Sequence, residues 1–177
     1  MKHAILPSPL GDILLTFGDE ALLGLYFVGQ KGQPVIAPHA PQQATHAVAR
    51  RTAAHLERYF LGIDEPFEVP IAFAGTRLQV AVWRALLEIP RGHTVSYAAL
   101  ARRVEAPAAV RAVGAAVGRN PVSIFVPCHR VVGSNGALTG YAGGLPRKTH
   151  LLRLEGALGD DGRLVQTPAS SSGHSAG

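Results

Sequence analysis

Cys128 has the strongest case for a chemical role in this sequence, because it is the only cysteine among 177 residues. A single cysteine cannot form a disulfide within its own chain, and a cysteine without a chemical role usually serves as a small core hydrophobe. Here Pro127 precedes the cysteine, His129 follows it, and a Gly-rich stretch lies shortly downstream. This setting predicts a thiol that is placed as a nucleophile.

The thiol requires a base, since a free cysteine has a pKa of about 8.5 and apolar burial raises it further. His129 is adjacent, but neighbouring side chains of an extended chain point apart, so we expect a water to bridge the thiol and the ring. Glu155, one of three acidic residues between positions 76 and 155, would orient the imidazole. The three residues predict a Cys-His-acid relay. The alternative interpretation makes His129 an ordinary loop histidine and Glu155 a surface acid at the end of a helix.

Positive charge is concentrated in the part of the sequence that contains Cys128. The net charge of the chain is +5. Residues 1–75 carry five Lys/Arg and seven Asp/Glu, whereas residues 76–155 carry eleven Lys/Arg and three Asp/Glu. One-sided basic charge of this kind is typical of a domain that binds a polyanion. A solvated, arginine-rich surface explains the same charge equally well.

Periodicity divides the chain into two parts, with a boundary near Ala74 and Gly75. The first part reads as strands and one helix, and the second part reads as helices. The predicted elements are a hairpin (13–17 and 22–27), a helix (42–61), an alternating strand (67–73), and helices after Thr76, at 97–104, at 108–117 and at 146–155. The helices at 97–104 and 108–117, joined by a short turn, match a helix-turn-helix.

The expected architecture is therefore an α/β protein in two domains with a tail. Residues 1–74 form a small sheet-plus-helix scaffold, residues 75–158 form a helical domain that carries Cys128, and residues 159–177 form a flexible tail. The end of that tail, residues 167–177, is rich in Ser, Gly and Ala, and we expect it to be disordered.

Seven segments around Cys128 then support a more specific interpretation. In order, they are Phe73 to Ala85, Thr94 to Ala101, Val110 to Gly114, Asn120 to Val122, Val126 to Val132, Thr139 to Gly144 and Leu151 to Gly156. In this order and spacing they resemble the O6-alkylguanine-DNA alkyltransferases, also called methylated-DNA–protein-cysteine methyltransferases, of the stand-alone bacterial type. The resemblance implies a ribonuclease-H-like fold for the first domain and a winged-helix-like fold for the second.

The same resemblance implies DNA repair by direct damage reversal. An alkyl group on guanine O6, in a base flipped out of DNA, would move irreversibly to Cys128, and O4-alkylthymine stays open as a second substrate. Thioethers are not hydrolysed, and the chain offers no second thiol, so each molecule should act once. The resemblance implies no metal and no organic cofactor. The implied partner is double-stranded DNA, bound through its minor groove by a monomer.

Matching positions take the roles of the family's catalytic residues. His129 would act on the thiol through a water, and Glu155 would fix the tautomer of the ring. Asn120 would tie the recognition helix to the active-site loop, although Asn before Pro is also an ordinary turn signal.

Six further residues would contact DNA or the base. Arg111 would fill the gap left by the extruded nucleotide, and Tyr97 would rotate that nucleotide outward. The remaining assignments are Tyr141 against the base, the Ala142 N–H toward O6, the Val126 carbonyl toward the guanine amino group, and Lys148 on a phosphate. Tight helix packing beside an exposed Arg111, and a core position for Tyr97, are the structural alternatives.

The sequence predicts a cellular compartment, and three other functions remain to be compared with the one above. The sequence shows no secretory leader and no apolar stretch of about 20 residues, and its single thiol suits a reducing cytosol, so we expect a cytoplasmic protein. A non-catalytic lesion-binding module would lack the reactive cysteine. A transcriptional regulator would carry base-reading polar side chains on its second helix, where this chain has mostly Ala and Gly. A cysteine peptidase would leave the basic charge unexplained.

Overall fold

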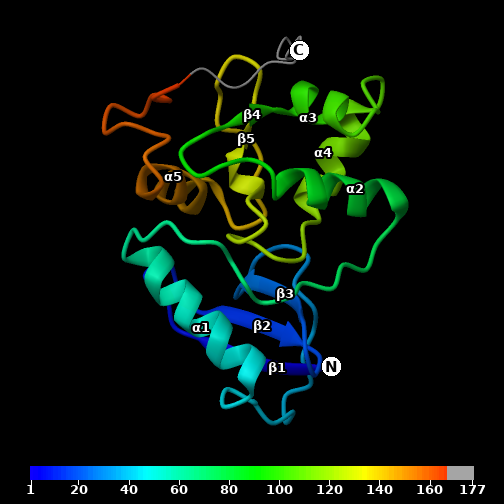
Figure 1. Cartoon of the computed structure of the whole chain (residues 1–177), viewed down its shortest axis with the longest axis vertical. Helices are drawn as coiled ribbons and strands as arrows, with labels where there is room; N and C mark the ends of the chain where they lie inside the picture. The colour runs from blue at the N-terminus through cyan, green and yellow to red at the C-terminus, as the bar shows by residue number, and fades with distance from the viewer. Residues whose placement is uncertain (167–177) are drawn as a thin grey trace. The chain divides into compact units, whose positions relative to one another are not determined.

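The computed structural model describes residues 1–166 and divides them into two compact units (Figure 1). The first unit comprises Met1–Ala74 together with Pro121–Phe125, and the second begins as Gly75–Asn120 and resumes at Val126. The five-residue return to the first unit differs from the expected boundaries, which place residues 75–158 in one domain. Within residues 1–166, no helix is long and apolar enough to cross a bilayer.

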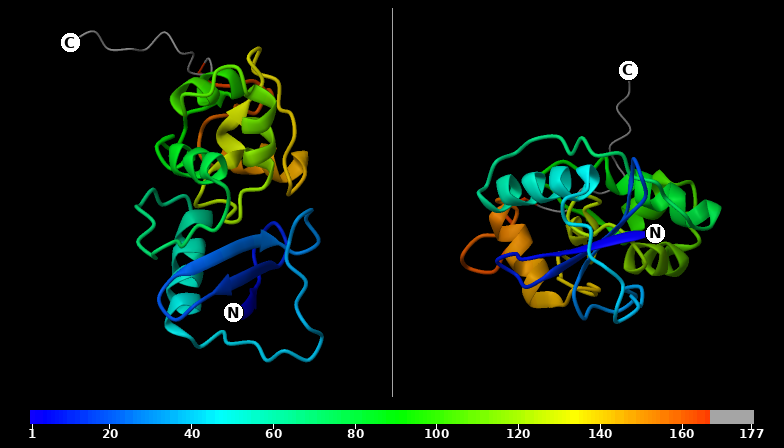
Figure 2. Two further views of the ribbon diagram at one scale, coloured as in Figure 1. Left: turned by 90° about the vertical axis from the view of Figure 1, so that its right-hand side faces the viewer. Right: turned by 90° about the horizontal axis from the view of Figure 1, so that it is seen from below.

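The first unit is a three-stranded antiparallel sheet with one helix. Its strands, β1 (Lys2–Leu6), β2 (Ile13–Phe17) and β3 (Leu22–Phe27), pair in the order β1-β2-β3. The predicted hairpin is therefore confirmed, whereas β1 was missed. Helix α1 (Ala47–Phe60) lies across one face of the sheet (Figure 2) and buries Val48, Leu56 and Tyr59. His46 caps this helix by accepting the Val48 N–H on Nδ1 at 3.2 Å.

The predicted strand at 67–73 does not form. Ile71 makes one parallel bridge to Leu22, with hydrogen bonds from Leu22 N to Pro70 O at 2.8 Å and from Ala72 N to Leu22 O at 3.0 Å. Prolines at positions 66 and 70 lack the N–H that a ladder needs, so the pairing stops after one bridge. The alternation did predict the inward face correctly, because Val69 is buried and its neighbours Glu68 and Pro70 are exposed.

The second unit is mostly helical. Its helices are α2 (Arg77–Leu86), α3 (Tyr97–Arg103), α4 (Val110–Gly118) and α5 (Leu145–Leu154), and the two-residue strands β4 (Val95–Ser96) and β5 (Val131–Val132) pair in parallel. Thr76 and Gln79 form a reciprocal capping box at the start of α2, and Ser96 accepts the Ala99 N–H at the start of α3. Trp83 ties α2 to α4 through a hydrogen bond from Nε1 to Ala116 O at 2.9 Å.

Residues 159–166 correct the prediction of a flexible tail from residue 159 onward. Gly159 N donates to Arg163 O at 2.8 Å, Val165 N donates to Ala157 O at 2.9 Å, and Leu158 bridges Leu164. Leu164 and Leu138 pack against a cluster formed by Leu152, Ala157 and Leu158. Apolar contacts made by single leucines in a polar stretch thus hold this segment in place. The rest of the predicted tail, residues 167–177, lies outside the described residues.

Candidate active site

Cys128 begins a short 3-10 helix, η1 (Cys128–Arg130), directly after a tight turn. In that turn Pro127 has φ −83° and ψ 65°, and Cys128 N donates to Val126 O at 2.8 Å, which is the geometry of an inverse γ-turn. The cysteine is only 5% exposed. Burial raises the pKa of its thiol, while a hydrogen bond from Asn120 and the charge of Lys148 act in the opposite direction.

His129, Arg130 and Glu155 form a buried cluster beside Cys128. The Nε2 atom of His129 lies 2.7 and 3.0 Å from the two carboxylate oxygens of Glu155, and both side chains are fully buried. Arg130 donates to the same carboxylate from Nε and Nη2, each at 2.8 Å, and Nη1 donates to Ile89 O. This is a two-pronged guanidinium–carboxylate pair, the strongest common form of the interaction.

The protonation states of this cluster follow from its contacts. Burial would raise the pKa of Glu155, but His129 and Arg130 overcome that effect and hold the pKa far below its usual range. Burial lowers the pKa of His129, with Glu155 opposing. A neutral ring beside a carboxylate carries its hydrogen on Nε2, which leaves Nδ1 as an acceptor. Nδ1 is buried and has no hydrogen-bond partner among residues 1–166.

Asn120 connects the end of α4 with the turn that precedes Cys128. Its side chain is buried, and Nδ2 donates to Val126 O at 2.7 Å. The structure thus joins two places that are six residues apart in sequence, as the predicted hinge requires. The same hydrogen bond corrects the assignment of Val126. Its carbonyl already accepts from Asn120 and from Cys128 N, so neither of its two lone pairs is left for a guanine amino group.

Lys148 does not lie at the surface, where the predicted phosphate contact requires it. The side chain is completely buried, and Nζ donates to the carbonyls of Val131 at 2.6 Å, Thr139 at 2.8 Å and Gly140 at 3.4 Å. An enclosed ammonium with three carbonyl acceptors cannot reach a phosphate, so the predicted phosphate contact is wrong. Burial lowers its pKa to about 8. Lys148 instead fastens the loop between β5 and α5.

The signal that would have found this role was available in the helical pattern. Lys148 precedes Leu151, Leu152 and Glu155 by three, four and seven positions, which places the first three on one face of α5 and Glu155, the C-cap, in line with them. All four residues are buried.

Tyr97 on α3 and two residues of the loop between β5 and α5 are partly exposed on the second unit. Tyr97 is the first residue of α3, is partly buried, and donates from its hydroxyl to Thr139 O at 3.4 Å. Burial raises the pKa of this phenol. Tyr141 and Ala142 are also partly exposed, whereas Gly143 is buried. The Thr139 carbonyl therefore accepts from both Tyr97 and Lys148, which links α3 and α5 through one loop.

Arg111 lies in the first turn of α4 and is exposed. The other exposed positions on this helix are Val110, Ala112, Ala115 and Gly118, so one long cation stands among short, uncharged side chains. Val113, Ala116 and Val117 form the opposite, buried face. Tight packing therefore explains the buried face of α4, while the small exposed residues remain available for a close approach by another molecule.

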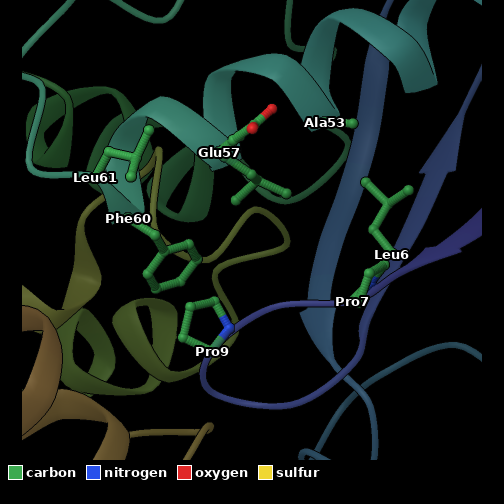
Figure 3. Close-up of a pocket in the computed structure, with 8 residues that line it drawn as sticks. Leu6, Pro7, Pro9, Ala53, Glu57, Phe60 and Leu61 are labelled. Carbon is green, nitrogen blue, oxygen red and sulfur yellow. The ribbon is translucent and has the colours of Figure 1, made fainter.

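The pocket shown in Figure 3 shares no lining residue with the Cys128 site. It measures about 450 Å³ and is lined only by residues of the first unit, among them Leu6, Pro9 and Phe60. Across the described part of the chain, no group of three His, Cys, Asp or Glu side chains is arranged to hold a metal ion.

Fold and site together define a mixed α/β protein with a single buried thiol, supported by a buried His–Glu–Arg cluster. The family model for the 6-O-methylguanine DNA methyltransferase, DNA binding domain, matches residues 77–157. The methylated-DNA–protein-cysteine methyltransferase of Methanosarcina acetivorans is 45% identical over 157 residues, covering 89% of this chain and 99% of that protein. The inducible enzyme of that name from Bacillus subtilis is 47% identical, covering 80% of this chain and 88% of its own length.

Among solved structures, Mycobacterium tuberculosis OGT in complex with DNA is similar to this chain, with a TM-score of 0.81 and 39% identity over 88% of this chain and 93% of that one. These similarities extend over both units rather than over the Cys128 region alone. The chain belongs to the methylated-DNA–protein-cysteine methyltransferase family.

Proposed function

We propose that this protein repairs DNA by moving the alkyl group of O6-alkylguanine to Cys128. The single observation that carries the proposal is the buried Cys128–His129–Glu155 arrangement in a chain of this family. In the transfer, a bond forms between Sγ and the alkyl carbon while the bond from that carbon to O6 breaks. The thiol proton passes to the histidine, guanine leaves as its anion, and the proton held by the histidine is then returned to the guanine ring, so that no net proton is gained or lost.

His129 is the group that receives the proton. Its neutral ring donates through Nε2 to Glu155, so the buried Nδ1 is the only acceptor that the ring offers. A water between Sγ and Nδ1 would carry the proton. Glu155 fixes the tautomer, and the carboxylate does not keep the proton itself because His129 and Arg130 hold its pKa low.

The reaction ends with the protein spent. Cys128 is the only thiol in the chain, so no second cysteine can accept the alkyl group from the first. A thioether is stable in water, and the transfer is therefore stoichiometric. O6-alkylguanine is the proposed substrate, with O4-alkylthymine a second base whose O-alkyl group has the same chemistry.

DNA binding is assigned to the second unit, where most of the positive charge lies. The matching family model is described as a DNA binding domain, and the similar Mycobacterium tuberculosis structure is a complex with DNA. A thiol that is 5% exposed cannot reach a stacked base, so the base must leave the duplex. Arg111 would enter the minor groove from α4, while Tyr97, Tyr141 and the Ala142 N–H would contact the flipped base.

The finer features of the architecture belong to the same proposal. We assign residues 1–74 to a scaffold domain of ribonuclease-H-like fold, and α3 and α4 to a helix-turn-helix in a winged-helix-like domain. We expect the protein to act as a monomer in the cytoplasm, where a free thiol stays reduced.

Intact-mass measurement tests the reaction. The protein is incubated with a short duplex that contains one O6-methylguanine, and a gain of about 14 Da, the mass of one methylene, is expected at one per chain. Cys128→Ser should abolish the gain. A wild-type protein that binds the damaged duplex and gains no mass would instead be a lesion-binding module.

A further inference from the structure

The segment Pro121–Phe125 belongs to the first unit, although the residues on both sides of it belong to the second. Asn120 precedes the segment, and Val126 follows it, two positions before Cys128. The hydrogen bond from Asn120 Nδ2 to Val126 O joins the two ends of the segment at 2.7 Å. The segment is therefore a loop whose two ends are hydrogen-bonded to each other next to Cys128. The residues between those ends belong to the first unit.

Backbone pairing holds the first half of this loop on β3. Leu25 N donates to Pro121 O at 2.8 Å, Ser123 N donates to Leu25 O at 2.9 Å, and Leu25 bridges Val122 in parallel. Because β2 occupies the opposite edge of β3, the loop pairs with the part of the free edge at Leu25, while Ile71 pairs with it at Leu22. Val122 and Ser123 are both buried.

An aromatic cluster holds the second half. The ring of Phe125 stacks on Phe67 with centroids 3.9 Å apart and planes 8° apart. Its edges meet His55 at 6.3 Å and Tyr59 at 6.2 Å, both of which lie on α1. Phe125 therefore connects the chain beside Cys128 with the helix and the 67–73 segment of the first unit.

The backbone between these two attachments is strained. Ile124 has φ +73°, a conformation that β-branched residues avoid, and its side chain is almost fully buried. Such a residue keeps its conformation only when the surrounding structure imposes it. The attachments at Leu25 and Phe125 lie on either side of Ile124 and provide that constraint.

We propose that the first unit positions the alkyl acceptor, and that Phe125 is the positioning residue through which it does so. With Phe125 seated, the loop keeps its strained path, and Val126 and Pro127 present Cys128 in the γ-turn described above. Without the packing of Phe125, the backbone of Ile124 relaxes, and the hydrogen bond between Asn120 and Val126 weakens. The proposal rests on Cys128 being the alkyl acceptor.

The test compares Phe125→Leu with Phe60→Leu. Both phenylalanines are half-buried in the first unit and contact Tyr59, but Phe60 has no part in the loop. Single-turnover transfer from a duplex with one O6-methylguanine is measured at saturating DNA, well below the unfolding temperature. We expect Phe125→Leu to lower the limiting rate by about 10²-fold, because small displacements of reacting groups have effects of that size. DNA affinity should not change, Phe60→Leu should react normally, and Phe125→Tyr should restore the rate.

A second readout does not depend on DNA. Iodoacetamide labels only Cys128 in this chain, so its rate reports how the thiol is held. We expect faster labelling in Phe125→Leu than in Phe60→Leu. Equal transfer rates and equal labelling in the two variants would overturn the positioning role. A wild-type protein that transfers no alkyl group, while labelling still responds to Phe125 alone, would overturn the proposed function and leave the positioning role standing.

Discussion

Each unit of the molecule contains a cluster of one glutamate, one histidine and one arginine, and the two clusters differ mainly in burial. In the first unit, Glu65 accepts from His55 Nδ1 at 2.9 Å and from the Nε of Arg58. In the second, Glu155 accepts from His129 and from two nitrogens of Arg130. The exposed fraction of the glutamate side chain is 29% for Glu65 and 0% for Glu155.

This difference in burial changes what the same three residue types can do. Hydrogen bonding from Arg58 lowers the pKa of Glu65, but water competes for its carboxylate. Glu155 has no such competition, so its charge is fully directed to His129 and Arg130. The His55 ring faces Phe67 and Phe125, whereas His129 is adjacent to a thiol. The first cluster joins α1 to the following loop, and the second can support proton transfer.

The largest expected difference between the two clusters is in the rate of alkyl transfer. Glu155→Gln removes the charge that fixes the His129 tautomer, and we expect the rate of alkyl transfer to fall by about 10²–10⁴-fold, the usual contribution of general base catalysis. Glu65→Gln keeps an acceptor for His55 and Arg58 and should leave the rate unchanged. Single-turnover kinetics on a methylated duplex measures both. Similar rates in the two variants would remove the distinction drawn here.

Stability should separate the clusters next. Glu155→Gln leaves the Arg130 charge buried without its carboxylate, and loss of one partner from a buried ion pair costs about 3–5 kcal/mol. Urea unfolding at neutral pH measures this loss. For Glu65→Gln we expect a much smaller change in the unfolding midpoint, because the Arg58 and Glu65 side chains are partly open to solvent. A larger loss in Glu65→Gln would show that burial does not govern these pairs.

The third prediction concerns pH. The folded-state pKa of Glu155 lies below its ordinary value of 4.5, so its contribution is complete above that pH and is lost as the pH falls toward the folded pKa. Below pH 4.5 the wild-type free energy of unfolding should therefore fall more steeply with decreasing pH than that of Glu155→Gln. Burial lowers the pKa of His129 from its ordinary value of 6.5, so stability begins to be lost through this ring below pH 6.5, before the range in which Glu155 is compared. Equal slopes would mean that Glu155 is not held ionised.

Burial can also be compared within a single helix. Lys148 and Arg153 both lie on α5, the first buried with three carbonyl acceptors and the second exposed. Lys148→Met leaves those carbonyls unsatisfied, and we expect a loss of about 1–3 kcal/mol in the free energy of unfolding. Arg153→Met should change it little. Thermal unfolding of the two variants checks this, and equal losses would contradict the assigned role of Lys148.

Salt should produce the smallest effect. The ion pair between Lys2 and Asp19 lies at the surface of the first unit, with 85% of the Asp19 side chain exposed. The Debye length is about 10 Å at 0.1 M salt and shortens to about 3 Å at 1 M, so added salt weakens an exposed ion pair of this kind. Asp19→Asn should therefore lower the free energy of unfolding slightly at low salt and leave it unchanged at high salt. The loss of unfolding free energy in Glu155→Gln should be the same at low and high salt. A strong salt dependence of that loss would argue against the burial of Glu155.

Several parts of the molecule were predictable from the sequence because their causes are local. Thr76 and Ser96 cap helices through residues three positions away, and the hairpin at 13–27 follows from two apolar runs and a turn. Cys128, His129 and Glu155 were identified by their types and by resemblance to one family. The pairing of His129 with Glu155 was predicted correctly, since both are fixed by elements whose spacing matches that family.

Other features depended on residues far apart in the chain, and only the tertiary structure decided them. Contacts of Leu138 and Leu164 with a buried cluster hold residues that were predicted to belong to a flexible tail. The strand predicted at 67–73 failed for a partly local reason, because Pro66 and Pro70 lack the N–H that a ladder needs and leave one bridge to the distant Leu22. The sequence by itself determined which side chains can do chemistry and where most helices begin. Burial made Lys148 a loop anchor, left the Val126 carbonyl without a free lone pair and enclosed Glu155, because burial depends on what packs around a residue.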